Sequence, residues 1–142
     1  MKGPLDSVEV SYFLHATEDP EKVRAAIARL SGRDAEAQAD ELLGHFGNKI
    51  LRVTVSFKGG DADSAFRTMV SQLPGQMRLE LVADLEEHLD DHSALFLRFD
   101  KERLVSGFLS AGTTNSVRVK VKPRAFLVRG GARDFYSKLF RG

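Results

Sequence analysis

The stretch of sequence that decides the fold reads Ser-Val-Arg-Val-Lys-Val-Lys, from Ser116 to Lys122. Apolar and basic side chains alternate along it, and a period of two is typical of a strand with one buried and one exposed face. The exposed face would carry Arg118, Lys120 and Lys122, and Pro123 ends the pattern. Such a strand needs a sheet with one covered face, so this stretch predicts a two-layer architecture.

Three more segments alternate in the same way. Residues 8–16, 50–58 and 94–99 each place apolar side chains on one face and mostly polar ones on the other. Their outer faces add further cations and two aromatic rings, namely Phe13, Arg52, Lys58, Phe96 and Arg98. The chain is therefore expected to form four strands with a basic outer surface.

Helices are predicted between the strands from apolar residues at helical spacing. One begins at residues 17–20, where Thr17 or Asp19 can act as the N-cap and Pro20 suits the first turn, and it ends at Gly32. The others span residues 61–73, 77–92 and 132–140, with a second short helix over 34–43 and a short helix or loop over 101–109. The fold class we expect is α+β, a two-layer sandwich of a mainly antiparallel four-stranded sheet with helices on one face.

The composition is that of one ordinary folded domain spanning residues 1–142. The chain is 42% hydrophobic and 29% charged, and a domain of this length can bury enough surface to hold a core without crosslinks. It contains no Cys, which excludes disulfides, thiol catalysis and Cys-based metal sites. No window approaches 18 apolar residues, so we expect a cytoplasmic protein without an export signal, an anchor or a membrane partner.

Charge is distributed unevenly along the chain, although the net charge is only +1. Residues 1–100 hold 11 Lys and Arg against 18 Asp and Glu, whereas residues 101–142 hold 10 Lys and Arg against two acidic residues. This asymmetry indicates a partner for the basic part, most often a nucleic acid. The alternative is that the basic tail lies against the chain's own acidic helices.

Four short motifs occur in an order that resembles a known family. They are VEVSYFLHATEDPEKV (8–23), GHFGN (44–48) leading into Ile50, LRFDK (97–101) and VRVKVK (117–122). Together they are similar to the archaeal RNA-binding family described as a predicted exosome subunit, over about residues 7–123. Lys49 stands where that family usually has Pro, and the tail over 124–142 has no counterpart in the resemblance.

The resemblance implies a two-layer α+β fold like that of the large-subunit ribosomal protein that contacts 5S ribosomal RNA. It also implies RNA and exosome subunits as partners, in RNA processing or degradation. The residues point the same way, because phosphates need cations and splayed bases need flat apolar surfaces on which to stack. The predicted RNA-binding residues are Phe13, His45, Asn48, Arg52, Lys58, Phe96, Arg98, Lys101, Arg118, Lys120, Lys122 and Arg124.

Other interpretations of the same residues remain open. The outer sheet face could be an ordinary solvated surface, or it could pair with a second copy of the chain and bury Phe13 and Phe96 in a homodimer without RNA. The turn at residues 44–48 could bind a phosphate or a base edge, or it could be structural, with Gly47 and Asn48 at positive φ. The basic tail could extend the cationic surface or dock on the acidic 77–92 helix.

Catalysis has little support in the sequence. No nucleophile elbow, P-loop or dinucleotide-binding glycine pattern is present, so we expect no enzymatic activity, no cofactor and no metal. Asp84, His88 and His92 would share one face of a continuous helix and could then hold a metal ion. A metal-dependent hydrolase is accordingly the least favoured alternative.

Overall fold

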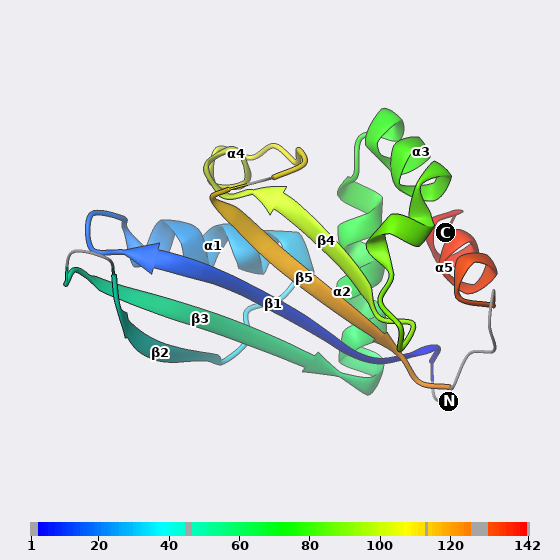
Figure 1. The fold of residues 1–142 in the computed structure, drawn as a ribbon, viewed down its shortest axis with the longest axis horizontal. Coiled ribbons are helices and arrows are strands. Elements are labelled where there is room, and N and C mark those ends of the chain that lie inside the picture. The colour runs from blue at the N-terminus through cyan, green and yellow to red at the C-terminus, as the bar shows by residue number, and fades with distance from the viewer. Residues whose placement is uncertain (1–2, 45–46, 113, 126–130, 142) are drawn as a thin grey trace.

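A five-stranded antiparallel sheet forms the centre of the protein, with the strand order β2-β3-β1-β5-β4 (Figure 1). The computed structural model describes residues 3–44, 47–112, 114–125 and 131–141. The predicted α+β class with an antiparallel sheet is confirmed, with five strands instead of four. The strands are β1 (Leu5–His15), β2 (Ala37–Leu43), β3 (Lys49–Lys58), β4 (Leu95–Asp100) and β5 (Ser116–Pro123).

Helices cover one face of this sheet. They are α1 (Pro20–Ser31), α2 (Gly59–Gln72), α3 (Gly75–Ala83), α4 (Lys101–Val105) and α5 (Gly131–Arg141), with a 3-10 turn, η1 (Leu85–His88). α1 and α2 lie side by side behind the sheet in Figure 1, and α3 lies beside α5. Within the described ranges the other face carries no helix, so the molecule has two layers and one open sheet surface.

The ends of α1 show how local sequence sets the elements. Asp19, rather than Thr17, is the N-cap, because its carboxylate accepts the Glu21 N–H at 3.0 Å. Gly32 ends the helix at a φ of 79°, a left-handed conformation that favours glycine. A side chain at this position would also come within 2.9 Å of Thr68. The predicted helix is therefore confirmed together with its end at Gly32.

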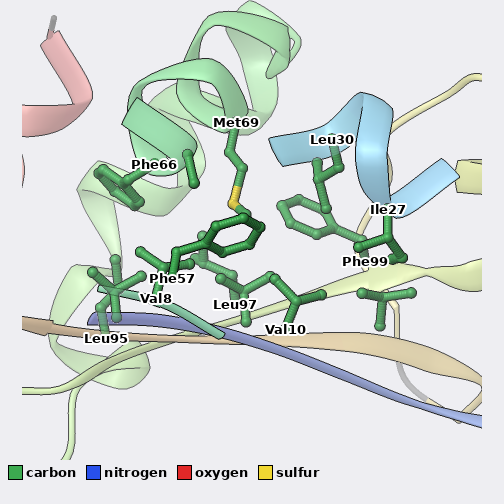
Figure 2. Packing of buried hydrophobic residues seen from close by; sticks show 14 of the residues in the cluster. Val8, Val10, Ile27, Leu30, Phe57, Phe66, Met69, Leu95, Leu97 and Phe99 are labelled. Carbon is green, nitrogen blue, oxygen red and sulfur yellow. The ribbon is translucent and has the colours of Figure 1, made fainter. Parts of the chain in front are cut away.

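The strand register places the apolar half of each long strand on the helical side. Val8 lies opposite Phe57 on β3 and Val121 on β5, and all three are buried. These side chains pack against α1 and α2. Figure 2 shows the strand residues Val8, Val10, Phe57, Leu95, Leu97 and Phe99 together with Ile27 and Leu30 of α1 and Phe66 and Met69 of α2. Because neighbouring residues of a strand point to opposite faces, the polar half of each strand is left on the open face.

The predicted short helix over residues 34–43 is wrong. Residues Ala37–Leu43 form β2, an edge strand that pairs antiparallel with β3, and all of its residues are exposed. Its Ala, Gln, Glu and Leu residues favour a helix, but that preference is weak and the backbone pairing with β3 overrides it. Ion pairs from Asp40 to Arg52 and from Glu41 to Lys49 join the two strands.

The predicted single helix over residues 77–92 is also wrong. α3 ends at Ala83, η1 follows over Leu85–His88, and Leu89 forms an isolated bridge with Leu95. Leu81 and Leu85 are buried, so the apolar spacing that predicted one helix reflects two successive elements that face the same core.

The chain returns to the core after β5. α5 confirms the predicted terminal helix over 132–140 and buries Tyr136 and Phe140. The Phe140 ring stacks edge-on against Phe66 of α2, with 5.6 Å between the ring centroids. The helices described in the structure are all too short or too polar to cross a membrane.

Candidate nucleic-acid interface

The open face is organised in rows of residues that lie opposite one another on successive strands. The central row contains Gln38, Thr54, Ser11, Arg118 and Arg98, from β2 to β4. The row on one side contains Ser56, Glu9, Lys120 and Phe96, and the row on the other side contains Asp40, Arg52 and Phe13. Most of the cations lie on the β5–β4 half of the face.

Arg98 and Arg118 lie directly opposite each other on β4 and β5, and both are exposed. Like charges directly opposite in a sheet destabilise it. Among the residues that the structure describes, no carboxylate lies within 4.0 Å of either guanidinium or of Lys58, Lys120 and Lys122. This half of the sheet therefore offers several positive charges that the protein itself does not neutralise.

Aromatic rings lie among these cations. The Lys120 Nζ sits 5.4 Å from the centroid of the Phe96 ring, which is 39% exposed. Phe13 on β1 is 37% exposed, beside Arg52 on β3. Their exposed fractions show that part of each ring is open to solvent.

Lys58 and Lys122 lie at one end of the face. They occupy β3 and β5 on either side of Ser7 of β1. Both lysines are exposed, whereas Ser7 is buried. The structure thus brings Phe13, Phe96 and the predicted cations of β3, β4 and β5 onto one surface, which we call the open basic face. Its members are Phe13, Arg52, Lys58, Phe96, Arg98, Arg118, Lys120 and Lys122.

The positive charge of Arg52 on β3 is partly neutralised by a residue that the sequence prediction missed. Asp40 of β2 accepts a hydrogen bond from Arg52 at 3.3 Å. An exposed ion pair of this kind contributes little to stability, but it offsets one positive charge of the open basic face. The alternation of Ala and polar residues over 37–40 is the signal that could have indicated a strand and placed Asp40 here.

Lys101 does not belong to the open basic face. Its side chain is 1% exposed, and its Nζ donates to the Phe13 carbonyl at 2.6 Å and to Glu18 Oε1 at 2.7 Å. Burial alone would raise the pKa of the Glu18 carboxyl. Hydrogen bonds from Lys101 and from the His15 N–H, together with the ammonium charge, outweigh burial and lower that pKa below its ordinary 4.5. Lys101 therefore ties the end of β1 to the start of α4 and holds no cation out to solvent.

Arg124 and Asn48 also lie apart from the Arg98–Arg118 pair. The Arg124 guanidinium donates to the carbonyls of Gly3 and Leu5, so it holds the start of the chain against the end of β5. Gly47 has the expected positive φ of 78°, whereas Asn48 does not. Asn48 is exposed at the start of β3, far from β4 in the strand order, and its carbonyl accepts the Gly44 N–H.

Two features of the turn at residues 44–48 complete the comparison with the sequence. His45 was predicted to contact RNA, but it lies outside the described residues. Lys49, which stands in the place of the usual Pro, begins β3 and forms an ion pair with Glu41 at 3.0 Å.

The described part of the basic tail that forms α5 packs beside α3 and η1, the elements found in place of the predicted 77–92 helix. The contact is apolar: none of the ion pairs found in the described ranges joins α5 to those elements. The Tyr136 hydroxyl anchors the helix by donating to the Ser93 carbonyl at 2.7 Å, with the Val121 carbonyl 3.3 Å away. Arg133, Lys138 and Arg141 are thus carried by the helical layer, and Arg129 lies outside the described residues.

The metal alternative loses its geometric basis. Asp84 ends α3, His88 ends η1 and His92 lies in the turn beyond, so the three residues do not share a face of one helix. Within the described ranges, no three His, Asp or Glu side chains are grouped closely enough to hold a metal ion. His88 Nδ1 lies instead 3.2 Å from the Phe96 carbonyl, beside β4.

Two hollows adjoin the cationic half of the face. One of about 350 Å³ lies beside the β4 edge, and its lining includes His88, Phe96 and Arg98. The other, of about 340 Å³, lies at the end of β5 and is lined in part by Lys120 and Lys122. A polyanion lying across β5 and β4 would have room beyond both strands.

Comparison with known proteins agrees with this surface chemistry. A family model described as RNA binding matches residues 7–123. The chain belongs to this RNA-binding family. A family relative, the RNA-binding protein PAB1135 of Pyrococcus abyssi, is 33% identical over 138 residues, covering 89% of this chain and 88% of that protein. The uncharacterised protein MJ0213 of Methanocaldococcus jannaschii is 28% identical over 110 residues, covering 72% and 73% of the two chains.

Solved structures extend the likeness to nearly the whole chain. The protein AF2318 of Archaeoglobus fulgidus superposes with a TM-score of 0.81 at 27% identity, covering 95% of this chain and 99% of that one. Mth689 of Methanothermobacter thermautotrophicus, with a TM-score of 0.80 and 21% identity, shares the fold and covers 97% and 99%. Matches of this extent reach into residues 124–142, so the tail has a structural counterpart that the sequence motifs did not show.

Proposed function

We propose that this protein binds RNA through its open basic face and acts as a non-catalytic accessory factor in RNA processing or exosome-linked degradation. One observation carries the proposal: Arg98 and Arg118 lie opposite each other on a solvent-exposed sheet, and no carboxylate within the described ranges neutralises them. Membership of the RNA-binding family and the name of the Pyrococcus relative support the choice of ligand.

The physical argument rests on what an opposed arginine pair costs. Two like charges across a pair of strands destabilise the sheet by roughly 0.2–1 kcal/mol relative to neutral residues. A bound anion between the guanidinium groups removes that cost and gains charge-assisted hydrogen bonds. RNA supplies such anions at regular intervals, and the neighbouring Lys120 and Lys122 of β5 are placed to meet further phosphates.

The same charges disfavour the homodimer interpretation. A second copy docked on this face would bring two sets of Arg98, Arg118 and Lys120 towards each other, with Glu9 and Asp40 as the acidic residues of the rows. Burying cations without a partner costs far more than burying the two half-exposed rings would return. A polyanion fits the face, whereas an identical copy does not.

Charge reversal on β5 tests the RNA-binding proposal. The variant R118E/K120E/K122E is compared with wild type by fluorescence anisotropy, using a labelled RNA hairpin that carries a single-stranded overhang. We expect wild-type affinity to fall steeply with salt and the variant to bind about 100-fold more weakly at about 0.15 M salt, where charges more than about 8 Å away are screened. The matched control R67E/R133E/K138E makes the same change of charge on exposed positions of α2 and α5, and its affinity should stay within about threefold of wild type. Equal binding by the β5 variant and wild type would reject the open basic face.

The accessory role needs a separate experiment. The protein is crosslinked to RNA in cells and recovered, the RNA is sequenced, and proteins that remain after nuclease treatment are identified. Recovery of exosome subunits together with RNA substrates of that machine supports the role. Recovery of RNA without any exosome subunit would leave RNA binding intact and reject the link to the exosome.

A further inference from the structure

Resting on the proposed RNA-binding function, we infer that the open basic face takes unpaired nucleotides rather than duplex RNA, along a diagonal from Phe96 on β4 over Arg118 on β5 to Phe13 on β1. The two rings would stack on bases and Arg118 would bind the phosphate backbone between them. This stretch of the open basic face is called the diagonal track below.

The strand register defines the diagonal track. Arg118 lies opposite both Arg98 and Ser11, so these three residues share the central row. β1 and β4 run parallel to each other because each is antiparallel to β5, and Phe96 precedes the central row by two residues while Phe13 follows it by two. The rings are thus two strands and four residues apart, or about 16 Å along the diagonal. Arg118 occupies the strand between them.

The exposure of the rings indicates what they bind. Phe96 and Phe13 are 39% and 37% exposed, although the sheet has a fully covered face on which apolar rings could be buried. In a duplex the faces of the bases are stacked on one another and cannot meet a protein ring, so an aromatic platform selects bases that are unpaired. A surface for duplex RNA would need the cations but would gain nothing from the rings.

The cations accompany the rings in the way that single-strand sites require. Lys120 lies directly opposite Phe96, and Arg98 is two residues further along the same strand. Single-strand grooves combine such a cationic path for the backbone with stacked bases. Near Phe13 the cation Arg52 is paired with Asp40, so the stronger end of the diagonal track is the one at β4.

The diagonal track is open where it leaves the sheet. β4 is an edge strand, and the hollow of about 350 Å³ beside it is lined by Phe96 and Arg98 on the sheet side. The far side of this hollow is formed by His88, Ala111 and Gly112, so a strand of RNA that stacks one base on Phe96 would pass over the hollow as it leaves the sheet. The face does not need the end of an RNA and would accept an internal unpaired segment.

Binding by two matched RNAs tests the choice of ligand. An unpaired octamer of mixed sequence and a blunt eight-base-pair duplex are titrated against wild type, F96L and F13L, which remove a ring but keep an apolar side chain. We expect wild type to prefer the octamer, and each variant to bind it about tenfold more weakly while its duplex binding stays unchanged. Thermal melting confirms that the variants fold, as expected for half-exposed positions.

Tryptophan reporters give a second readout that does not depend on loss of affinity. The chain contains no Trp, so F96W and F13W each introduce a single fluorophore that retains a stacking surface. The octamer should quench the fluorescence of both. L79W is the matched control, because Leu79 is 68% exposed and lies on α3, which packs beside α5 in the helical layer. Its fluorescence should not change.

The outcomes separate this inference from the proposed function. If wild type binds octamer and duplex equally and the leucine variants bind as wild type does, RNA binding stands and the diagonal track is wrong. Quenching of L79W but not of F96W would also overturn it. If neither RNA binds at any salt concentration, the proposed function fails and the inference fails with it.

Discussion

Replacing Lys101 by Met separates the structural cations of this protein from those of the open basic face. The substitution removes an ammonium that is 1% exposed and keeps most of the volume of the side chain. It leaves the Phe13 carbonyl without its donor and leaves Glu18 without its ionic partner. Removing one member of a buried ion pair costs roughly 3–5 kcal/mol, but the Glu18 side chain is 25% exposed and keeps the His15 N–H as a donor. We therefore expect a loss of about 2 kcal/mol in the free energy of unfolding.

Urea denaturation of K101M measures this loss, and RNA titration of the same variant completes the experiment. The folded variant should bind RNA within about twofold of wild type, because Lys101 does not reach the open basic face. K120M is the matched control: it should keep wild-type stability within about 0.5 kcal/mol and lose RNA affinity. The reasoning is refuted if K101M is as stable as wild type, or if it loses RNA affinity as K120M does.

Three further predictions concern pH, the tail helix and the arginine pair. The pKa of Glu18 is lowered in the folded protein. The stability that this carboxylate contributes is therefore full above about pH 4.5 and is lost as the pH falls through the pKa of the folded state. Acid titration should destabilise wild type more than E18Q, and equal acid sensitivity would count against the ion pair. Y136F removes the hydroxyl that hydrogen-bonds the Ser93 carbonyl and should lower the free energy of unfolding by about 1–2 kcal/mol. Urea denaturation measures this loss, and an unchanged urea midpoint would be the contrary result. R98Q should raise the free energy of unfolding by about 0.5 kcal/mol while weakening RNA binding. Its slope of log affinity against log salt concentration should become shallower by about 0.7. A variant that is destabilised and binds RNA normally would contradict the role of the Arg98–Arg118 pair.

The sequence predicts the centre of this fold well and its margins poorly. Alternation along residues 116–122 gives β5 with its correct faces, because a strand paired on both sides and covered on one has little freedom in its pattern. The edge strand β2 has every residue exposed, so its pattern is limited to the short alternation of Ala and polar residues over 37–40, and its residues favour a helix instead. The break after Ala83 is hidden for the opposite reason, since α3 and η1 both bury leucines on one side.

The candidate site shows the same division. Residues that alternate outward from paired strands, such as Arg98 and Arg118, are found on one surface as predicted. Lys101 was predicted to bind RNA as part of the LRFDK motif, yet the chain turns into α4 at that point and the side chain points into the protein. The opposition of Arg98 and Arg118 depends on the register between β4 and β5, which sequence spacing alone does not fix.

Amide chemical-shift mapping tests the central claim most directly. The 15N-labelled protein is titrated with an unpaired RNA octamer, and shift changes are assigned along the chain. The account predicts that the largest changes fall on β4, β5 and the second half of β1, around Phe96, Arg98, Arg118 and Phe13, with little change on α1 or α2. Changes concentrated on α5 or on the β2–β3 turn, with the β4 and β5 amides unmoved, would contradict it.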